Sequence, residues 1–174
     1  MRSFRSSLLL ALVLALVGAA ASPAQSTWQP GHPGIGFTPP KSNQWVQLVS
    51  SPRIAMKASA RPQPVALKFV IQTGLHINSH SPHSPFLIPT SLTFDSVPDV
   101  HIANVQYPAG VDYHFRFSPQ EALSVYTGEF SLLVPLRARA GKYMLHGQLR
   151  YQACDDRSCN PPKTLPVTVE VTAQ

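Results

Sequence analysis

Residues 65–72 read VALKFVIQ, and residues 165–171 read LPVTVEV. In the first stretch, one set of alternate positions holds Val, Leu, Phe and Ile, and in the second Val alternates with Thr and Glu. A period of two residues is the side-chain period of a β-strand, with one face turned to a core and the other to water or a second layer. These two stretches therefore predict strands with one buried face.

Five further segments have the same character and are separated by turn signals. They are rich in β-branched and aromatic residues, and they comprise residues 45–49, 87–94, 102–107, 125–136 and 143–152. The 18 Pro and 9 Gly argue against long helices. About seven strands in one domain predict an all-β fold, an immunoglobulin-like antiparallel β-sandwich.

The N-terminal region has a different pattern. Residues 8–17 are continuously apolar, follow Arg2 and Arg5, and run into the small residues GAAA at 18–21. Such a stretch is too short to span a bilayer and predicts a signal peptide over residues 1–21. A flexible Pro/Gly/Ser-rich leader is expected over residues 22–42 and the β-sandwich domain over residues 43–174. We expect a periplasmic or secreted protein that does not span the membrane.

The charge distribution and the missing motifs exclude several function classes. The sequence has 14 Lys+Arg against 8 Asp+Glu, and beyond residue 21 no two basic residues are adjacent. Dispersed charge of this kind predicts no nucleic-acid partner. There is no nucleotide-binding glycine loop, no nucleophile elbow and no pair of carboxylates in a catalytic arrangement. No cofactor is expected.

Cys154 and Cys159 are the only cysteines. An oxidising compartment permits a disulfide, and four intervening residues let the two sulfurs meet. A bridge that closes so small a loop stabilises the fold by only about 2 kcal/mol in the chain-entropy model, which is little for a structural staple. A structural bridge and a redox pair both remain open at this point.

The flanks of the two cysteines resemble a known family. The motif is YQAC at residues 151–154 followed by CNPP at 159–162, with VYTG at 125–128 and HINS at 76–79 further upstream. Together these motifs resemble the N-terminal periplasmic domain of the thiol:disulfide interchange protein DsbD, over residues 45–171. The resemblance implies an immunoglobulin-like domain with Cys154 and Cys159 as its redox pair.

The resemblance also implies partners and a cap. Electrons would pass between the pair and thioredoxin-like periplasmic proteins, including disulfide isomerases and the thioredoxins of cytochrome maturation. The best-known members continue into a membrane electron carrier, whereas this sequence ends at Gln174, so we expect a separately encoded carrier. Val125, Tyr126 and Gly128 would form part of a cap loop over the sulfurs, although Tyr126 could equally be an ordinary strand aromatic.

The residues around the pair indicate how it would work. Asp155 and Asp156 disfavour a thiolate at Cys154, and Arg157 partly offsets them. This predicts a passive relay that stays oxidised until a partner thiolate attacks, and not a strong oxidant. Three groups of neighbours are expected at the site: Tyr151, which could instead be a core or corner tyrosine; His76 with Asn78; and Pro161 with Pro162, which cannot continue a regular ladder.

Three histidines lie within eight residues, at His76, His80 and His83. In an exported protein they could bind copper or zinc, with the cysteines as soft ligands when reduced. The intervening Ser and Pro instead favour an exposed loop, and the HINS motif favours a place beside the cysteines. Three functions thus remain: a thiol–disulfide relay with interchange activity, a metal-binding domain, and a non-catalytic interaction domain with a structural disulfide.

Overall fold

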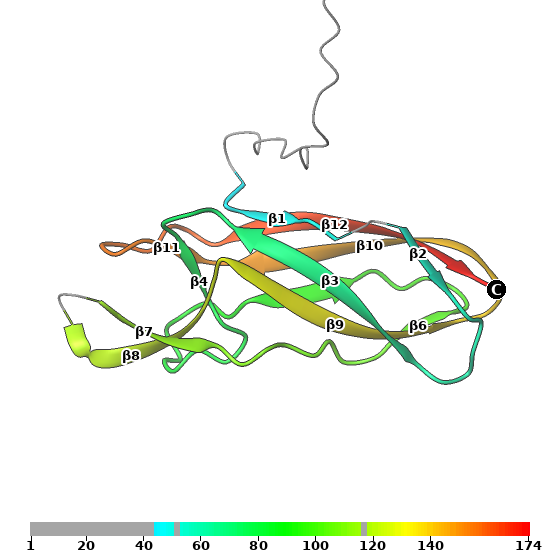
Figure 1. Ribbon diagram of the computed structural model, residues 1–174, viewed down its shortest axis with the longest axis horizontal. Coiled ribbons are helices and arrows are strands. Elements are labelled where there is room, and N and C mark those ends of the chain that lie inside the picture. Colours follow the sequence, from blue (N-terminus) through cyan, green and yellow to red (C-terminus); the bar gives the residue numbers. More distant parts are fainter. Residues whose placement is uncertain (1–43, 51–52, 116–117) are drawn as a thin grey trace, which may run out of the picture. The chain divides into compact units, whose positions relative to one another are not determined.

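The computed structural model describes residues 44–50, 53–115 and 118–174, and the predicted signal peptide and leader lie outside these ranges. Within them the chain forms strands and no helix (Figure 1). No segment of the described part could therefore cross a membrane as a helix. The strands are β1 (Val46–Leu48), β2 (Arg53–Met56), β3 (Gln63–Ile71), β4 (His76–Asn78), β5 (Ser91–Phe94), β6 (Val100–Ile102), β7 (Val111–Phe115), β8 (Ser118–Thr127), β9 (Glu129–Ala138), β10 (Gly141–Tyr151), β11 (Ala153–Cys154) and β12 (Lys163–Ala173).

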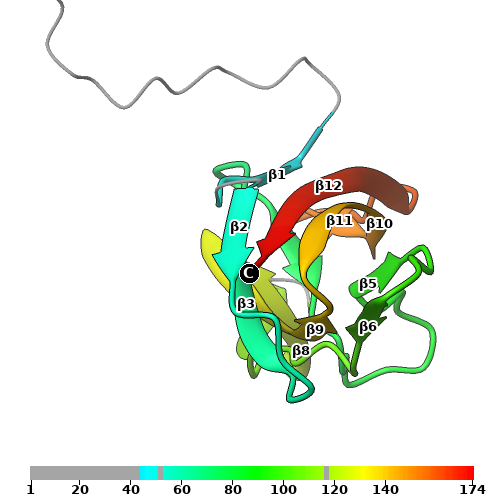
Figure 2. The same ribbon diagram turned by 90° about the vertical axis from the view of Figure 1, so that its right-hand side faces the viewer.

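The strands make three four-stranded sheets. Sheet A has the order β1-β3-β9-β6, sheet B has β2-β12-β10-β5, and sheet C has β11-β4-β8-β7. The pairings within these sheets are antiparallel except for β2, which runs parallel to β12. Viewed along the long axis, β3 and β9 form one layer and β10 and β12 the other (Figure 2). Sheet C lies at the end of the sandwich opposite the C-terminus (Figure 1).

The core lies between sheets A and B. Of the alternating positions predicted to face the core, Val65 is half-buried and the others are buried, and each fully buried side chain contributes about 1.5–3 kcal/mol relative to an exposed one. The largest fully buried side chains include Phe69, Leu67, Leu132 and Leu136 from sheet A and Tyr151, Leu145, Leu149 and Val167 from sheet B. The prediction of an all-β immunoglobulin-like sandwich is confirmed.

The prediction of a single strand over residues 125–136 is wrong. It is the end of β8 followed by β9, which belong to sheets C and A respectively. The chain changes sheets at Gly128, whose φ of 59° lies in the left-handed region that glycine adopts without a steric penalty. The Gly128 carbonyl accepts a hydrogen bond from the Ile71 N–H, which ties the junction to sheet A.

The part of sheet C formed by β11, β4 and residues 123–126 of β8 is buried on both faces. Ile77, Tyr126 and Ala153 occupy one row across three neighbouring strands and join the main core. Because neighbouring residues of a strand point to opposite faces, the next row, Cys154 and His76, turns the other way. Cys154 is buried but stands outside the main core cluster. The fold thus creates a second, smaller buried face at one end of the sandwich.

Candidate functional site

The two cysteines face each other across a tight hairpin. Cys154 and Cys159 form a disulfide, with their Cα atoms 4.0 Å apart. The Asn160 N–H donates to the Ala153 carbonyl at 2.8 Å, and the Asp155 N–H donates to the Ser158 carbonyl at 2.9 Å. The hairpin therefore holds the two cysteine backbones side by side through hydrogen bonds of its own.

The loop at the tip of this hairpin, residues 155–158, is closed by a carboxylate. Asp155 Oδ1 accepts hydrogen bonds from the backbone N–H groups of Arg157 and Ser158, each at 2.8 Å. These bonds lower the pKa of Asp155 below its usual value of 3.8, so the side chain remains an anion at neutral pH. An acidic residue directly after Cys154 thus has a structural use in the turn.

The two sulfurs have very different surroundings. Cys154 is 0% exposed, whereas Cys159 is an exposed residue. A disulfide reacts by in-line attack of a thiolate on one sulfur, with the other sulfur leaving. Access from outside therefore favours attack at Cys159, with Cys154 as the leaving sulfur.

His76 is the residue paired with Cys154 across the β11–β4 ladder. Residues directly opposite each other in an antiparallel pair have their Cβ atoms about 4.5–5.5 Å apart on one face, so the two side chains are neighbours. The His76 ring is 3% exposed and packs on Tyr113 at 4.2 Å and on Phe115 at 6.0 Å between ring centroids. The imidazole is thus enclosed beside the buried sulfur.

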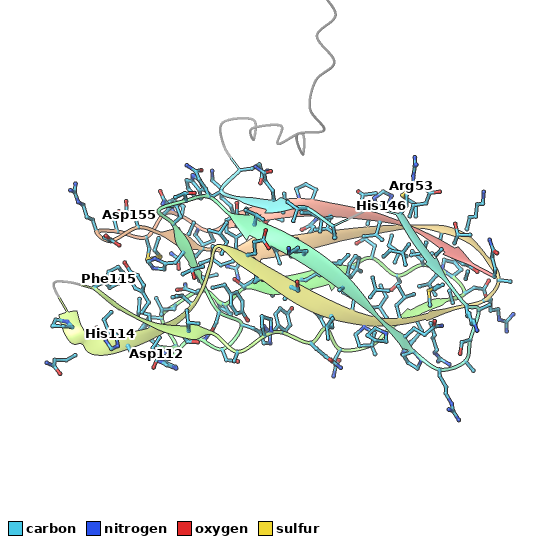
Figure 3. The ribbon with its side chains drawn as sticks, in the orientation of Figure 1. Arg53, Asp112, His114, Phe115, His146 and Asp155 are labelled. Carbon is cyan, nitrogen blue, oxygen red and sulfur yellow. A yellow bond between two sulfur atoms is a disulfide. The ribbon has the colours of Figure 1, made fainter. Side chains whose placement is uncertain are left out.

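Tyr113 connects this imidazole to the cysteine loop. Its hydroxyl donates a hydrogen bond to Asp156 Oδ1 while its ring contacts His76. Figure 3 shows Phe115 on β7 and Asp155 on the cysteine hairpin at the same end of the molecule. Two separate arms, β7 with β8 and β10 with β11, therefore enclose His76.

Burial lowers the pKa of His76 below its usual value of 6.5. The loss of hydration is the largest cause, and the charges of Asp156 and then Asp155 act in the opposite direction and raise the pKa. The lowered pKa keeps the ring mainly neutral at neutral pH. It also makes the protonated ring a stronger acid than an exposed histidine.

Asn78 anchors the short strand β4. Its side chain is 0% exposed, and Nδ2 donates to the Ile88 carbonyl and to Gln152 Oε1, both at 3.1 Å. Gln152 in turn donates from Nε2 to the Asn160 carbonyl at 3.1 Å, just beyond Cys159. A chain of amides therefore links β4 to both sides of the cysteine hairpin.

The residues expected to form the cap occupy several positions. Val125 is fully buried opposite Asn78, and Gly128 lies at the junction between sheets. Tyr126 is 4% exposed in the main core, stacked on Phe130, and its hydroxyl donates to the Pro108 carbonyl. A ring held there, on the face turned away from Cys154, does not fit the role of a lid. The aromatic rings beside the site come from β7.

The remaining expected neighbours divide in the same way. Tyr151 is 0% exposed and belongs to the main core, which matches the core-tyrosine alternative. Burial raises the pKa of Tyr151, and the backbone of Trp45 and Val46 lowers it by less. Pro161 and Pro162 are exposed and precede β12, so no ladder continues directly from Cys159.

The three histidines do not come together. His80 Nδ1 lies 2.9 Å from the Thr90 carbonyl and its ring stacks on Tyr107, whereas His83 Nδ1 lies 3.0 Å from the Ala122 carbonyl. Within the described residues, no three His, Cys, Asp or Glu side chains form a group suited to a metal ion. The exposed-loop interpretation is wrong for residues 76–79, which are buried, and fits His80 and His83, which are exposed.

Sequence reasoning missed Tyr113, Phe115 and Gln152. Val111, Tyr113 and Phe115 alternate with Asp112 and His114, which is the two-residue period that predicts a strand. That signal could have revealed β7. Nothing in the local sequence indicates that Tyr113 reaches across to His76 and Asp156.

Comparisons with known proteins give structural matches only. No family profile matches the sequence, and no curated protein is similar to it. The reduced N-terminal domain of DsbD from Neisseria meningitidis is 17% identical, with 65% of this chain and 86% of that chain covered and a TM-score of 0.45. The N-terminal periplasmic domain of ScsB from Proteus mirabilis is 16% identical, with 66% of this chain and 42% of that chain covered and a TM-score of 0.47.

A third match is a complex between the DsbD N-terminal and PilB N-terminal domains from Neisseria meningitidis, at 15% identity. It covers 62% of this chain and 78% of that chain, with a TM-score of 0.43. Fold and site together define a class, an all-β sandwich with a disulfide of unequal exposure at one end.

Proposed function

We propose that this protein is a thiol–disulfide exchange domain that passes electrons through Cys154 and Cys159. The observation that carries the proposal is the unequal exposure of the two cysteines, with Cys154 at 0% and Cys159 an exposed residue. A purely structural bridge needs no exposed sulfur, whereas an exchange reaction needs one sulfur that a partner can reach.

The position of the bridge in the fold supports the same function. The disulfide spans a sequence separation of 5, so in the chain-entropy model it contributes only about 2 kcal/mol. The hairpin is already closed by the backbone bonds of Asp155 and Asn160. Reduction can therefore proceed without loss of the fold, as a reversible carrier requires.

The exchange has two steps. A partner thiolate attacks Cys159 Sγ, the bond between the sulfurs breaks, and its electron pair leaves on Cys154 Sγ. The second cysteine of the partner, as a thiolate, then attacks the sulfur of the partner's first cysteine. This breaks the mixed disulfide and releases Cys159 as a thiolate. The partner ends as a disulfide, and this domain ends as a dithiol that carries two electrons.

The partner that fits this chemistry is a thioredoxin-like periplasmic domain with a reactive Cys-x-x-Cys pair. Its attacking cysteine has a lowered pKa, whereas Cys154 is buried next to Asp155 and Asp156. The more nucleophilic thiolate therefore belongs to the partner. A periplasmic location agrees with the expected signal peptide, and a separately encoded membrane carrier would supply or accept the electrons.

Single-cysteine variants test the proposal. Cys154→Ser leaves the exposed Cys159, and it should form a mixed disulfide with a thioredoxin-like domain whose resolving cysteine is also replaced by Ser. Cys159→Ser leaves the buried Cys154 and serves as the matched control, with at least about tenfold less adduct. Non-reducing gel electrophoresis and intact mass measure both products.

The opposite result is equally clear. If neither variant forms an adduct and reduction of the unmodified protein unfolds it, the bridge is a structural staple. The protein would then be an interaction domain without exchange activity. Circular dichroism in the presence and absence of dithiothreitol records the second half of that outcome.

A further inference from the structure

The buried imidazole beside Cys154 has a nitrogen that the rest of the fold does not use. His76 Nε2 is inaccessible to solvent and has no hydrogen-bond partner among the described residues. A buried polar atom without a partner costs about 1–3 kcal/mol, and such atoms are uncommon in native structures. This one belongs to the residue that is paired with Cys154.

The exchange reaction requires a proton at the sulfur of Cys154, next to His76. When Cys159 is attacked, a negative charge develops on the sulfur of Cys154, which is 0% exposed. A buried thiolate is poorly solvated and is therefore a poor leaving group unless it is protonated or hydrogen-bonded. Asp155 and Asp156 make the charge at that sulfur less favourable still.

We propose that His76 is the proton donor and acceptor for Cys154 during thiol–disulfide exchange, an assignment that rests on the proposed function. As the bond between the sulfurs breaks, the protonated ring gives its Nε2 proton to Cys154 Sγ and becomes neutral. In the reverse reaction the neutral ring takes the proton from the Cys154 thiol, and the resulting thiolate attacks the mixed disulfide. The forward and reverse reactions together return the proton to the ring.

The groups that face the ring are consistent with this role. Tyr113 packs on the imidazole and is hydrogen-bonded to Asp156, and Phe115 shields another side. Asp156 and Asp155 favour protonation of the ring, and burial opposes it. The ring is therefore held in one orientation beside the sulfur, and its charge is set by opposing influences of the kind that tune an acid–base group.

The first test uses the unmodified protein and needs no physiological partner. Nuclear magnetic resonance of the ring nitrogens reports the pKa of His76 in the disulfide form and in the form reduced by dithiothreitol. If the ring shares a proton with Cys154, the pKa of His76 should fall on reduction, because a hydrogen bond from the neutral Cys154 thiol to Nε2 stabilises the uncharged ring. An unchanged pKa would overturn the assignment.

The second test is kinetic. In His76→Gln, the side chain can still form a hydrogen bond but cannot carry a proton, so the rate of reduction by dithiothreitol should fall about tenfold or more at pH 7. The deficit should widen as the pH falls, because a larger fraction of the wild-type rings is then protonated despite the lowered pKa of His76. His146→Gln, an exposed histidine on β10 (Figure 3), is the matched control and should react at the wild-type rate.

The two proposals can fail separately. If the cysteine variants trap a partner but His76→Gln has the wild-type rate and pH profile, the relay stands and the role of His76 is wrong. If the pKa of His76 moves on reduction but no partner is trapped, the proton exchange stands and the relay is wrong. The magnetic resonance measurement keeps the inference testable even if the variant does not fold.

Discussion

The β10–β12 ladder and the β11–β4 ladder show two ways to bury a strand. The first joins two strands of 11 residues, whose buried positions hold Leu, Val, Ala and Gly together with Tyr151. The second joins Ala153 and Cys154 to Ile77 and His76, and all four residues are buried. The long ladder gains its stability from hydrocarbon, whereas the short one keeps polar groups buried and needs specific hydrogen bonds.

This difference separates stability from chemistry. The long ladder joins the two central strands of sheet B. Replacing one of its apolar side chains by another of similar size would change no reactive group. The short ladder buries Asn78 and His76 at one end, where Cys154 is paired with His76. The disulfide therefore lies on the short, partly polar ladder and not on the long apolar one.

The largest expected effect comes from shortening a side chain in the long ladder. Leu149→Ala removes a side chain that is 0% exposed, so the free energy of unfolding should fall by about 2–5 kcal/mol. Urea denaturation followed by fluorescence measures the loss. Gln148→Ala, an exposed position on the same strand, should change stability by less than about 0.5 kcal/mol. Equal losses in the two variants would contradict the assignment of the core.

A smaller effect is expected in the short ladder from Asn78→Ala. The change removes the two hydrogen bonds from Nδ2, and the loss should be about 1–2 kcal/mol. Asn78 Oδ1 is itself buried without a partner among the described residues, so its removal offsets part of the cost. Thermal unfolding measures the change. Asn104→Ala, at an exposed position, is the control, and a loss of the same size there would speak against the amide chain.

The disulfide should contribute about 2 kcal/mol or less. Reduction with dithiothreitol removes a constraint on only a short loop, and the hairpin keeps its backbone hydrogen bonds. Urea denaturation with and without the reductant gives the difference. A loss above about 5 kcal/mol would show that the bridge holds the fold together.

The smallest effect is the pH dependence of stability due to His76. Its pKa in the folded state lies below 6.5, so the unfolded state binds more protons and stability falls as the pH drops below about 6.5. The slope cannot exceed about 1.4 kcal/mol per pH unit for one group. Asp155 acts in a separate window, because the stability from its lowered pKa is lost only as the pH falls below 3.8. Denaturation at pH 7 and pH 5 should show the fall in the wild type and not in His76→Gln.

The same two ladders show which strands the sequence predicts and which it does not. The alternation of Val167, Val169 and Val171 predicts a strand directly, because one buried face gives a two-residue period. Residues 76–78 are buried on both faces and include His and Asn, so they have no such period and resemble a loop. A strand of three residues is too short for a periodic signal to separate from chance.

The candidate site was predictable only in part. Cys154, Cys159, His76 and Asn78 follow from the motif, and the structure places them on one short ladder and its hairpin. The lid expected at Tyr126 depended on which way that side chain points, and the alternation within β8 turns it into the main core. Tyr113 reaches His76 from a strand 37 positions further along the chain, and such a contact leaves no mark on local sequence.

The turn at residues 155–158 closes through Asp155 and the backbone, and none of these bonds involves sulfur. After reduction the two thiols should thus remain within one short turn, where each meets the other at a high effective concentration. A mixed disulfide on Cys159 would then be short lived, because Cys154 can displace the partner without a search through chain conformations. If the domain exchanges disulfides as proposed, this return of the bond between Cys154 and Cys159 should quickly release a thiol that does not accept or donate electrons.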